Sequence, residues 1–365
     1  MTLEKSLYLG LVIFALSLFT CQEYIEFEEP ETFKESIYIE GKLTKGSPST
    51  VVVKIGQVFD FVTSPSLYLA EYVQLIDESE NVLELKTRAQ GIFKLEIPED
   101  HPYFKVDYGS AYKIKFKLRT GETYESSYDT LYQVPTPTDL TLDKISKNVS
   151  FLDGTFETQE IVTFNISTPL VSENGNKPNL MWELQSVYKQ TDYPTGGGLR
   201  RCPVTGPPKV CYLTIDPVEN YKVLNATSLA SSQVTDFNIL EADNSNTFVF
   251  SEGHYLTAFQ QSISNAAYEY WSRVNEVVYR DGTIFETPAG KVRSNIKNID
   301  SQSQEEVYGY FFVTESKLIR AYVSADYAGN PRPQCPAAGD MHSVFCDNCL
   351  CEINSTTEKP DYWVE

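Results

Sequence analysis

Residues 112–119 read YKIKFKLR, and this stretch decides the fold class. Apolar and cationic residues alternate along it, the apolar ones being Tyr112, Ile114, Phe116 and Leu118. Because successive side chains of a β-strand point to opposite faces, the alternation predicts a strand with one buried and one solvated face. The Thr120-Gly121-Glu122 turn that follows favours an antiparallel return.

Similar strand-like runs recur about every 10 residues around this stretch, separated by Gly, Asn, Asp and Pro, which is typical of an antiparallel sandwich. They are rich in β-branched and aromatic residues, and the plainest are 36–44 (SIYIEGKLT), 51–61 (VVVKIGQVFDF) and 123–128 (TYESSY). We therefore expect residues 36–134 to form an N-terminal β-sandwich of the immunoglobulin or fibronectin-III type.

The segment Gln133–Asp139 (QVPTPTD) is the best domain boundary, because two prolines at alternate positions favour an extended linker. Beyond it, residues 135–334 are expected to form a second β-sandwich domain. Its plainest strands are 161–167 and 180–188, and two closing strands are expected at 307–314 and 318–323.

One segment departs from the β pattern. From Leu256 onward, apolar residues recur in steps of three and four, which predicts an amphipathic helix over residues 256–280. Asp281-Gly282 is expected to end it. The aromatic stripe of this helix is interpreted as a face packed on a sheet.

The amino-acid composition limits the functions that this chain can have. The chain has 365 residues, a formal net charge of −20 and 41% hydrophobic residues. Its length suggests two or three domains, and its hydrophobic content excludes wholesale disorder. Nucleic-acid binding needs clustered Lys and Arg, so this charge argues against a nucleic-acid partner.

The first residues predict export. Leu7 to Thr20 is an apolar or neutral run of 14 residues, which is too short to span a bilayer but suits a signal peptide over residues 1–20. The Leu18-Phe19-Thr20-Cys21 sequence resembles a bacterial lipobox, so Cys21 is the expected lipidation site. An ordinary secretory peptide followed by an incidental cysteine is the alternative.

Residues 21–35 are expected to form a solvated tether, because positions 22–35 hold six Glu and one Lys. Such an acidic stretch after a lipidated cysteine also resembles the export signal of lipoproteins displayed on the outer face of the Bacteroidota outer membrane. The protein is therefore expected at the outer membrane, lipid-anchored and facing the exterior.

The cysteines support an oxidising compartment. Six of the seven remain after Cys21 and are expected to form disulfides. Cys202 and Cys211 enclose a Pro/Gly turn, so they are predicted to bond to each other. The other four are Cys335, Cys346, Cys349 and Cys351, and a zinc site is the alternative for them.

The C-terminal segment 335–365 is predicted to be a folded cap pinned by these disulfides. Its composition cannot build a core alone, and four cysteines supply cross-links in place of burial. Trp363 is expected to be buried in it. Cys349 with Cys351 is the least favoured pairing, because side chains two residues apart on a strand point the same way but lie too far apart to bond.

No catalytic constellation is visible. None of the three histidines, His101, His254 and His342, lies in an HExxH motif, and no Gly-x-Ser-x-Gly elbow occurs. The run from Asp243 to Asn246 offers oxygen ligands for Ca²⁺, but a solvated turn is the simpler interpretation. We therefore expect no catalytic residues, no metal and no cofactor.

Several segments together resemble an uncharacterised Bacteroidota outer-membrane lipoprotein family that is known by a domain-of-unknown-function label. After the lipobox they are IYIEGKLT (37–44), AAYEYWSRVNEVV (266–278), GTIFETPAGKVRSNI (282–296), VYGYFFV (307–313) and KPDYW (359–363). The resemblance implies an accessory lipoprotein that associates with TonB-dependent barrels of the starch-utilisation type. It assigns no catalytic or binding residues.

Three functions follow as expectations. The first is a non-enzymatic surface lipoprotein that serves as an accessory extracellular subunit of an outer-membrane β-barrel. The second is a ligand-capturing lid that stacks a small molecule or peptide on exposed aromatics such as those in 188–193, and it requires a concave aromatic patch. The third is an exported hydrolase, which requires convergent carboxylates or a histidine-centred site in one pocket; neither is expected.

Overall fold

The computed structural model describes residues 36–57, 68–150, 155–193, 202, 206–217, 219–242, 248–278, 292–299, 307–335 and 348–364. In this part of the chain the protein is mainly β, with antiparallel and mixed sheets and one α-helix, α2 (Asn265–Val278). None of the described helices is long and apolar enough to cross a membrane.

The strands run in chain order as β1 (Ile37–Lys45), β2 (Ser49–Gln57), β3 (Ala70–Asp77), β4 (Val82–Glu84), β5 (Lys86–Ala89), β6 (Ile92–Ile97), β7 (Ala111–Leu118), β8 (Thr123–Ser126), β9 (Asp129–Thr130), β10 (Asp139–Ser150), β11 (Phe156–Pro169), β12 (Asn179–Asp192), β13 (Lys209–Ile215), β14 (Tyr221–Leu224), β15 (Gln233–Glu241), β16 (His254–Ile263), β17 (Ile296–Asn298), β18 (Val307–Val323) and β19 (Ser355–Thr356).

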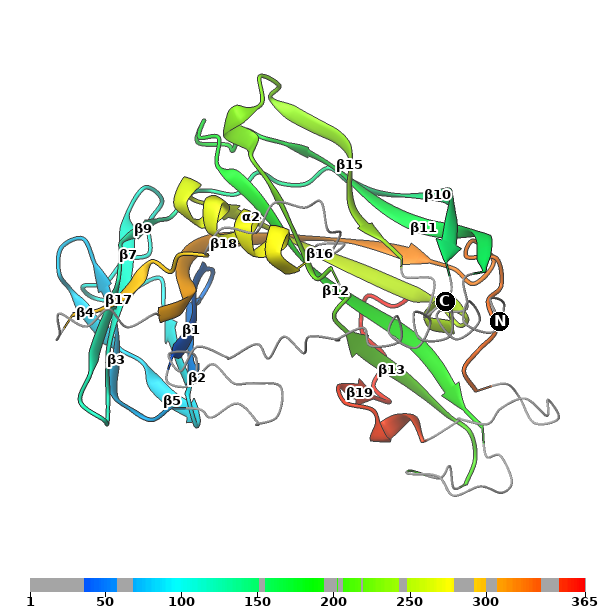
Figure 1. Cartoon of the computed structure of the whole chain (residues 1–365), viewed down its shortest axis with the longest axis horizontal. Helices are drawn as coiled ribbons and strands as arrows, with labels where there is room; N and C mark the ends of the chain where they lie inside the picture. The colour runs from blue at the N-terminus through cyan, green and yellow to red at the C-terminus, as the bar shows by residue number, and fades with distance from the viewer. Residues whose placement is uncertain are drawn as a thin grey trace, which may run out of the picture.

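These strands form three sheets among the described residues (Figure 1). The largest has the order β19-β13-β12-β16-β18-β1-β2-β6-β5, with β14 also on β12. A second sheet has the order β17-β8-β7-β3-β4, with β9 on β7, and a third has the order β10-β11-β15. The N-terminal core lies between the first two sheets, and the second core lies between the third sheet and the β12, β16 and β18 part of the first.

The alternation in residues 112–119 is confirmed as strand β7. Tyr112, Ile114, Phe116 and Leu118 are buried in the N-terminal core, whereas the lysines between them are half-buried. The cationic face is balanced by acidic neighbours: Lys113 lies 3.3 Å from Glu125 on the adjacent strand β8.

The two closing strands expected at 307–314 and 318–323 are a single strand, β18. Its first half pairs in parallel with β1, and its second half pairs antiparallel with β16. β18 and the short strand β17 therefore complete sheets of the N-terminal unit, although both follow the expected boundary at residue 134 by more than 150 residues. The sequence pattern could not predict this, because alternation reports which faces are buried and not which strand is the partner.

The predicted linker 133–139 has no regular structure before β10 begins at Asp139, but polar side chains of β16 and β18 hold it in place. Gln260 on β16 donates to the carbonyl oxygen of Pro135 at 2.6 Å and accepts from the indole N–H of Trp182 at 2.9 Å. Glu315 on β18 accepts from the backbone N–H of Val134 at 2.8 Å. The linker is thus held against the strands that join the two units.

The predicted helix 256–280 is half wrong. Residues up to Ile263 form strand β16, and the helix is confirmed only over Asn265–Val278; residues 279 and 280 lie outside the described part. β16 is covered on both faces, so its sequence lacks the alternation of a half-buried strand. The boundary signal is Ser264, whose hydroxyl accepts the N–H of Ala267 as a helix cap. The aromatic stripe packs as expected, with Tyr270 stacked on Tyr310.

The predicted bond between Cys202 and Cys211 is wrong. Cys202 is bonded to Cys351 and Cys211 to Cys349, with Cα atoms 6.4 and 6.0 Å apart. The physical reason is that the C-terminal segment, and not a local hairpin, lies along the free side of β13, where β19 pairs with it. Cys335 is also disulfide-bonded. Cys346 lies outside the described residues.

The folded cap is confirmed for residues 348–364. Trp363 is only 5% exposed and packs its ring against Tyr212 and Tyr255, with centroids 5.0 and 5.2 Å away. Figure 1 shows this C-terminal segment beside β13, far from β1 along the sheet. The disulfides place the protein in an oxidising, extracytoplasmic compartment.

Asp129 on β9 predicts a pH-dependent stability. Its side chain is 3% exposed and accepts the N–H of Val313 at 2.7 Å, and burial raises its pKa to about 6. A raised pKa means that the folded state binds the proton more tightly than the unfolded state. This stabilising contribution is present below about pH 4 and is lost as pH rises through about 6.

We expect the stability of the wild type relative to Asp129→Asn to fall by roughly 2 kcal/mol between pH 4 and pH 7. Urea unfolding of both proteins across this range is the measurement. A stability difference that does not change with pH would contradict the assignment.

Candidate functional site

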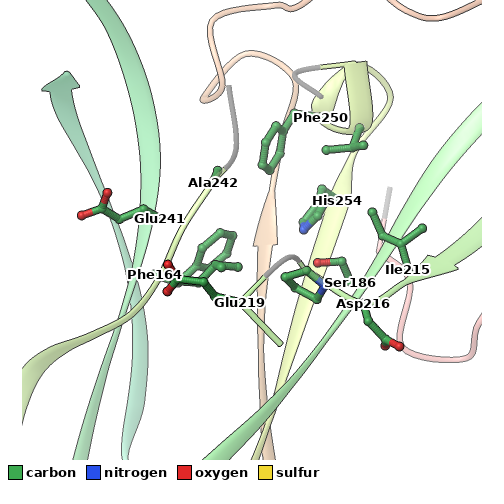
Figure 2. A pocket seen from close by; sticks show the side chains of 12 residues that line it. Phe164, Ser186, Ile215, Asp216, Glu219, Glu241, Ala242, Phe250 and His254 are labelled. Atoms are coloured by element: carbon green, nitrogen blue, oxygen red, sulfur yellow. The ribbon is translucent and has the colours of Figure 1, made fainter. Parts of the chain in front are cut away.

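The candidate site is a pocket of about 290 Å³ between the three-stranded sheet and the large sheet. Its walls are mostly apolar and come from both sheets and from a 3-10 turn at 248–250 (Figure 2). Phe164 lies on β11, Leu240 on β15, and Val249 and Phe250 on the turn. The volume lies at the lower end of the range of ligand sites, so it suits a small molecule.

His254 is the buried ionisable side chain of this pocket. Its side chain is only 3% exposed, and neither ring nitrogen has a hydrogen-bond partner of good geometry among the described residues. The rings of Phe250 and Phe164 flank it, with centroids 4.6 and 6.2 Å away. Burial lowers the pKa of His254 to about 3, and the backbone of Val249 offsets this only in part. The ring is therefore neutral at pH 7, and apart from its backbone interaction with Val249 it has no hydrogen-bond partner among the described residues.

The turn before β16 fixes the position of His254. Gly253 has φ of +104°, and a Cβ there would lie 2.7 Å from the hydroxyl oxygen of Tyr322, so only glycine fits. Its carbonyl oxygen accepts the N–H of Lys189 on β12 at 3.1 Å. In the β12–β16 register, His254 lies opposite Tyr188, which places it on the same face as Leu256 and Ser186.

The C-terminal cap supports the same strand from behind. Tyr255 points to the opposite face from His254 and packs with Tyr212, Val187 and Trp363. The disulfide-bonded cap therefore backs the β12, β13 and β16 strands that carry the pocket.

Carboxylates line the pocket beside its apolar walls. Asp216 and Glu219 follow β13 and are exposed, and Glu241 ends β15 (Figure 2). Glu241 forms an ion pair with Lys147 at 2.7 Å. Within the part of the chain that the structure describes, Asp216 and Glu219 have no ion pair. The lining is thus negative where it meets solvent and neutral around His254.

A second recess, of about 550 Å³, lies beside helix α2 and is lined by Arg273, Arg293 and Tyr310. Both arginines are exposed. They are already solvated, so the absence of an ion pair to either of them within the described part of the chain carries no desolvation cost. The buried, unpartnered imidazole makes the smaller pocket the better candidate. No group of three potential metal ligands occurs among the described residues.

We expect His254→Leu to be at least as stable as the wild type at pH 7, because an apolar side chain removes two unsatisfied buried nitrogens. The wild type should then lose stability relative to this variant by roughly 1 kcal/mol per pH unit as pH falls below about 6.5. The sign follows from the lowered pKa, since only the unfolded state takes up the proton in that range.

Chemical denaturation of both proteins at pH 7 and pH 4.5 is the measurement. A His254→Leu protein that is clearly less stable at both pH values would show that the imidazole has a structural partner.

The residues singled out in the sequence lie elsewhere. Cys21, Cys346 and the Asp243–Asn246 run are outside the described residues, and the other five cysteines are in disulfides. Tyr188, proposed as a stacking surface, is 6% exposed and packs against Phe248, so it is not available for stacking. His254 lines a pocket together with Ser186, which the sequence did not predict.

Sequence reasoning missed His254 because the expected helix began two residues later, which left the histidine in an unassigned segment. The available signal was Gly253-His254, a glycine that permits a sharp turn directly before an apolar run. The sequence could not single out Asp216, Glu219 and Glu241, because a chain this acidic has carboxylates along its whole length.

Residues 22–320 match a family described as a domain of unknown function, DUF4249. A search of the curated proteins finds no relative of this chain.

Proposed function

We propose that this chain, which belongs to the DUF4249 family, is a cell-surface binding protein that holds a small ligand against His254. The observation that carries the proposal is a buried imidazole in an apolar pocket that has, among the described residues, no side-chain hydrogen-bond partner and only a backbone interaction with Val249. An unsatisfied buried polar group destabilises a fold, typically by about 1–3 kcal/mol. A ligand that completes its hydrogen bonds supplies the reason for keeping it.

The geometry supports binding better than hydrolysis. Ser186 and His254 share the pocket, but no hydrogen bond joins them, and no carboxylate within the described residues orients the imidazole. A general base works best with a pKa near the operating pH, and the pKa of His254 is lowered to about 3. We therefore propose a non-enzymatic role, without a cofactor.

A fragment screen tests the binding role. The full chain in lipid nanodiscs is screened by ligand-observed NMR against small amphiphiles, beside empty nanodiscs. Ala242→Phe should abolish the binding signals because Ala242 lines the pocket. Ala89→Phe, at an exposed position on β5, is the matched control and should keep them. Fragments that bind both variants equally, or none that bind the wild type, would contradict the proposal.

We further propose that the protein is anchored through a lipid on Cys21 and acts as an accessory subunit of an outer-membrane β-barrel. The lipobox-like sequence 18–21 and the acidic segment after it support the anchor, and the disulfides fit an exported protein. We also propose that the two sandwiches are of the immunoglobulin or fibronectin-III type.

Purification of the native protein in mild detergent tests this second role. A barrel protein should co-purify with the wild type, and Cys21→Ala should lose both membrane association and the partner. A wild-type protein that runs alone at its monomer mass would contradict the accessory role and leave the binding role standing.

A further inference from the structure

The lining of the pocket is divided into three chemically distinct parts. His254 offers an uncharged donor and acceptor, Phe164 and Phe250 offer aromatic walls beside it, and Asp216 and Glu219 offer negative charge where the lining is exposed. A ligand that satisfies all three must carry complementary groups in the same order. The following inference rests on the proposed binding function and names its ligand class.

We propose that the pocket takes a small amphipathic cation, with a hydroxyl group at His254, an aromatic or similar flat apolar body between Phe164 and Phe250, and a protonated amine at Asp216 and Glu219.

The buried end favours a hydroxyl over a charged group. A neutral imidazole can accept a proton from a hydroxyl through one nitrogen and donate to the hydroxyl oxygen of a ligand through the other. A charged group buried among Phe164, Phe250 and Leu240 would have to give up its hydration without an opposite charge beside it. A hydroxyl group can donate to the imidazole nitrogen that the backbone of Val249 leaves open, and it does so without that penalty.

The exposed end favours a cation. Asp216 and Glu219 carry no ion pair within the described residues, whereas Glu241 is already bound to Lys147. The formal net charge of −20 adds long-range attraction for cations and repulsion for anions. Anionic ligands such as carboxylates are therefore disfavoured both by the whole protein and at this lining.

The size of the pocket limits the body to about one aromatic ring. A volume of about 290 Å³ has no room for an oligosaccharide or a folded peptide. Tyramine is a suitable probe, because it places a phenolic hydroxyl and a primary amine at opposite ends of one ring.

Four compounds separate the three features by calorimetric titration of the full chain in nanodiscs. Tyramine carries all of them, phenethylamine lacks the hydroxyl, 2-(4-hydroxyphenyl)ethanol lacks the charge, and 3-(4-hydroxyphenyl)propionate reverses it. We expect tyramine to bind at least 10-fold more tightly than either deletion compound, and the propionate to show no binding.

Three variants assign these preferences to residues. The double variant Asp216→Asn/Glu219→Gln should reduce the preference for tyramine over the uncharged alcohol to within about twofold. His254→Leu should reduce the preference for tyramine over phenethylamine to within about twofold. Glu84→Gln, an exposed carboxylate of β4 in the N-terminal sheet, is the charge control and should change neither ratio.

The outcomes separate this inference from the binding function on which it rests. Equal binding of tyramine and the uncharged alcohol by the wild type, or tightest binding of the propionate, overturns the cation assignment while the pocket stays a binding site. If no compound binds although Ala242-sensitive fragments do, the assigned chemistry is wrong. If no Ala242-sensitive fragment binds either, both proposals fail.

Discussion

Gly309→Ala is expected to prevent the protein from folding. Gly309 lies on β18, where that strand runs beside β1, and has φ of +93°. A Cβ atom there would lie 1.7 Å from the carbonyl oxygen of Ile39, which is backbone and cannot move aside. Relief requires separating β18 from β1, and this pairing joins the large sheet across the two units. A loss of more than about 4 kcal/mol is therefore expected.

Gly109→Ala is the matched control. Gly109 also has a positive φ, of +87°, but a Cβ there meets nothing within 4 Å. It should lose only about 1 kcal/mol from backbone strain. Urea unfolding followed by circular dichroism compares the two variants, and a Gly309→Ala protein as stable as Gly109→Ala would contradict the close approach of β18 to β1.

Removal of both disulfides that hold the cap is expected to destabilise the protein by more than the sum of the single removals. The two bonds join the same two segments, each across more than 130 residues of chain. When one bond is absent, the other still closes the long loop, so only a ring of about 10 residues is opened, worth about 3 kcal/mol. When both are absent, the long loop also opens, for about 8 kcal/mol in total on the same chain-entropy estimate.

Cys202→Ala/Cys351→Ala and Cys211→Ala/Cys349→Ala are the single removals, and the quadruple variant is the double removal. Unfolding free energies and the tryptophan emission of the cap are measured under non-reducing conditions. Strictly additive losses would show that the two bonds do not constrain one common loop.

Local features of the fold could be predicted from the sequence, and long-range ones could not. The period-2 pattern around Ile114 identifies β7, and the prolines of 133–139 identify the linker. The pairing of β1 with β18 and the bonds from β13 to the cap join segments far apart in the chain. A local sequence pattern reports which side chains are buried, so it cannot identify a partner strand or a partner cysteine far away in the chain.

The candidate site was the least predictable part. His254 lies on a strand buried on both faces, where the spacing of apolar residues also fits a helix. Its significance depends on the absence of a hydrogen-bond partner, which only the packed structure reveals. Asp216 and Glu219 become distinctive only beside that imidazole.

The most direct test of the binding function is NMR of the full chain in nanodiscs with ¹⁵N-labelled histidine, since the sequence contains only three histidines. The ring nitrogens of His254 are identified by their loss in His254→Leu, and they should show a neutral imidazole even at pH 5 because its pKa is lowered to about 3. Addition of an Ala242-sensitive fragment should shift the His254 signals and leave those of His101 unchanged. Unmoved His254 signals at saturating fragment, or an imidazole that is already protonated at pH 5, would contradict the account.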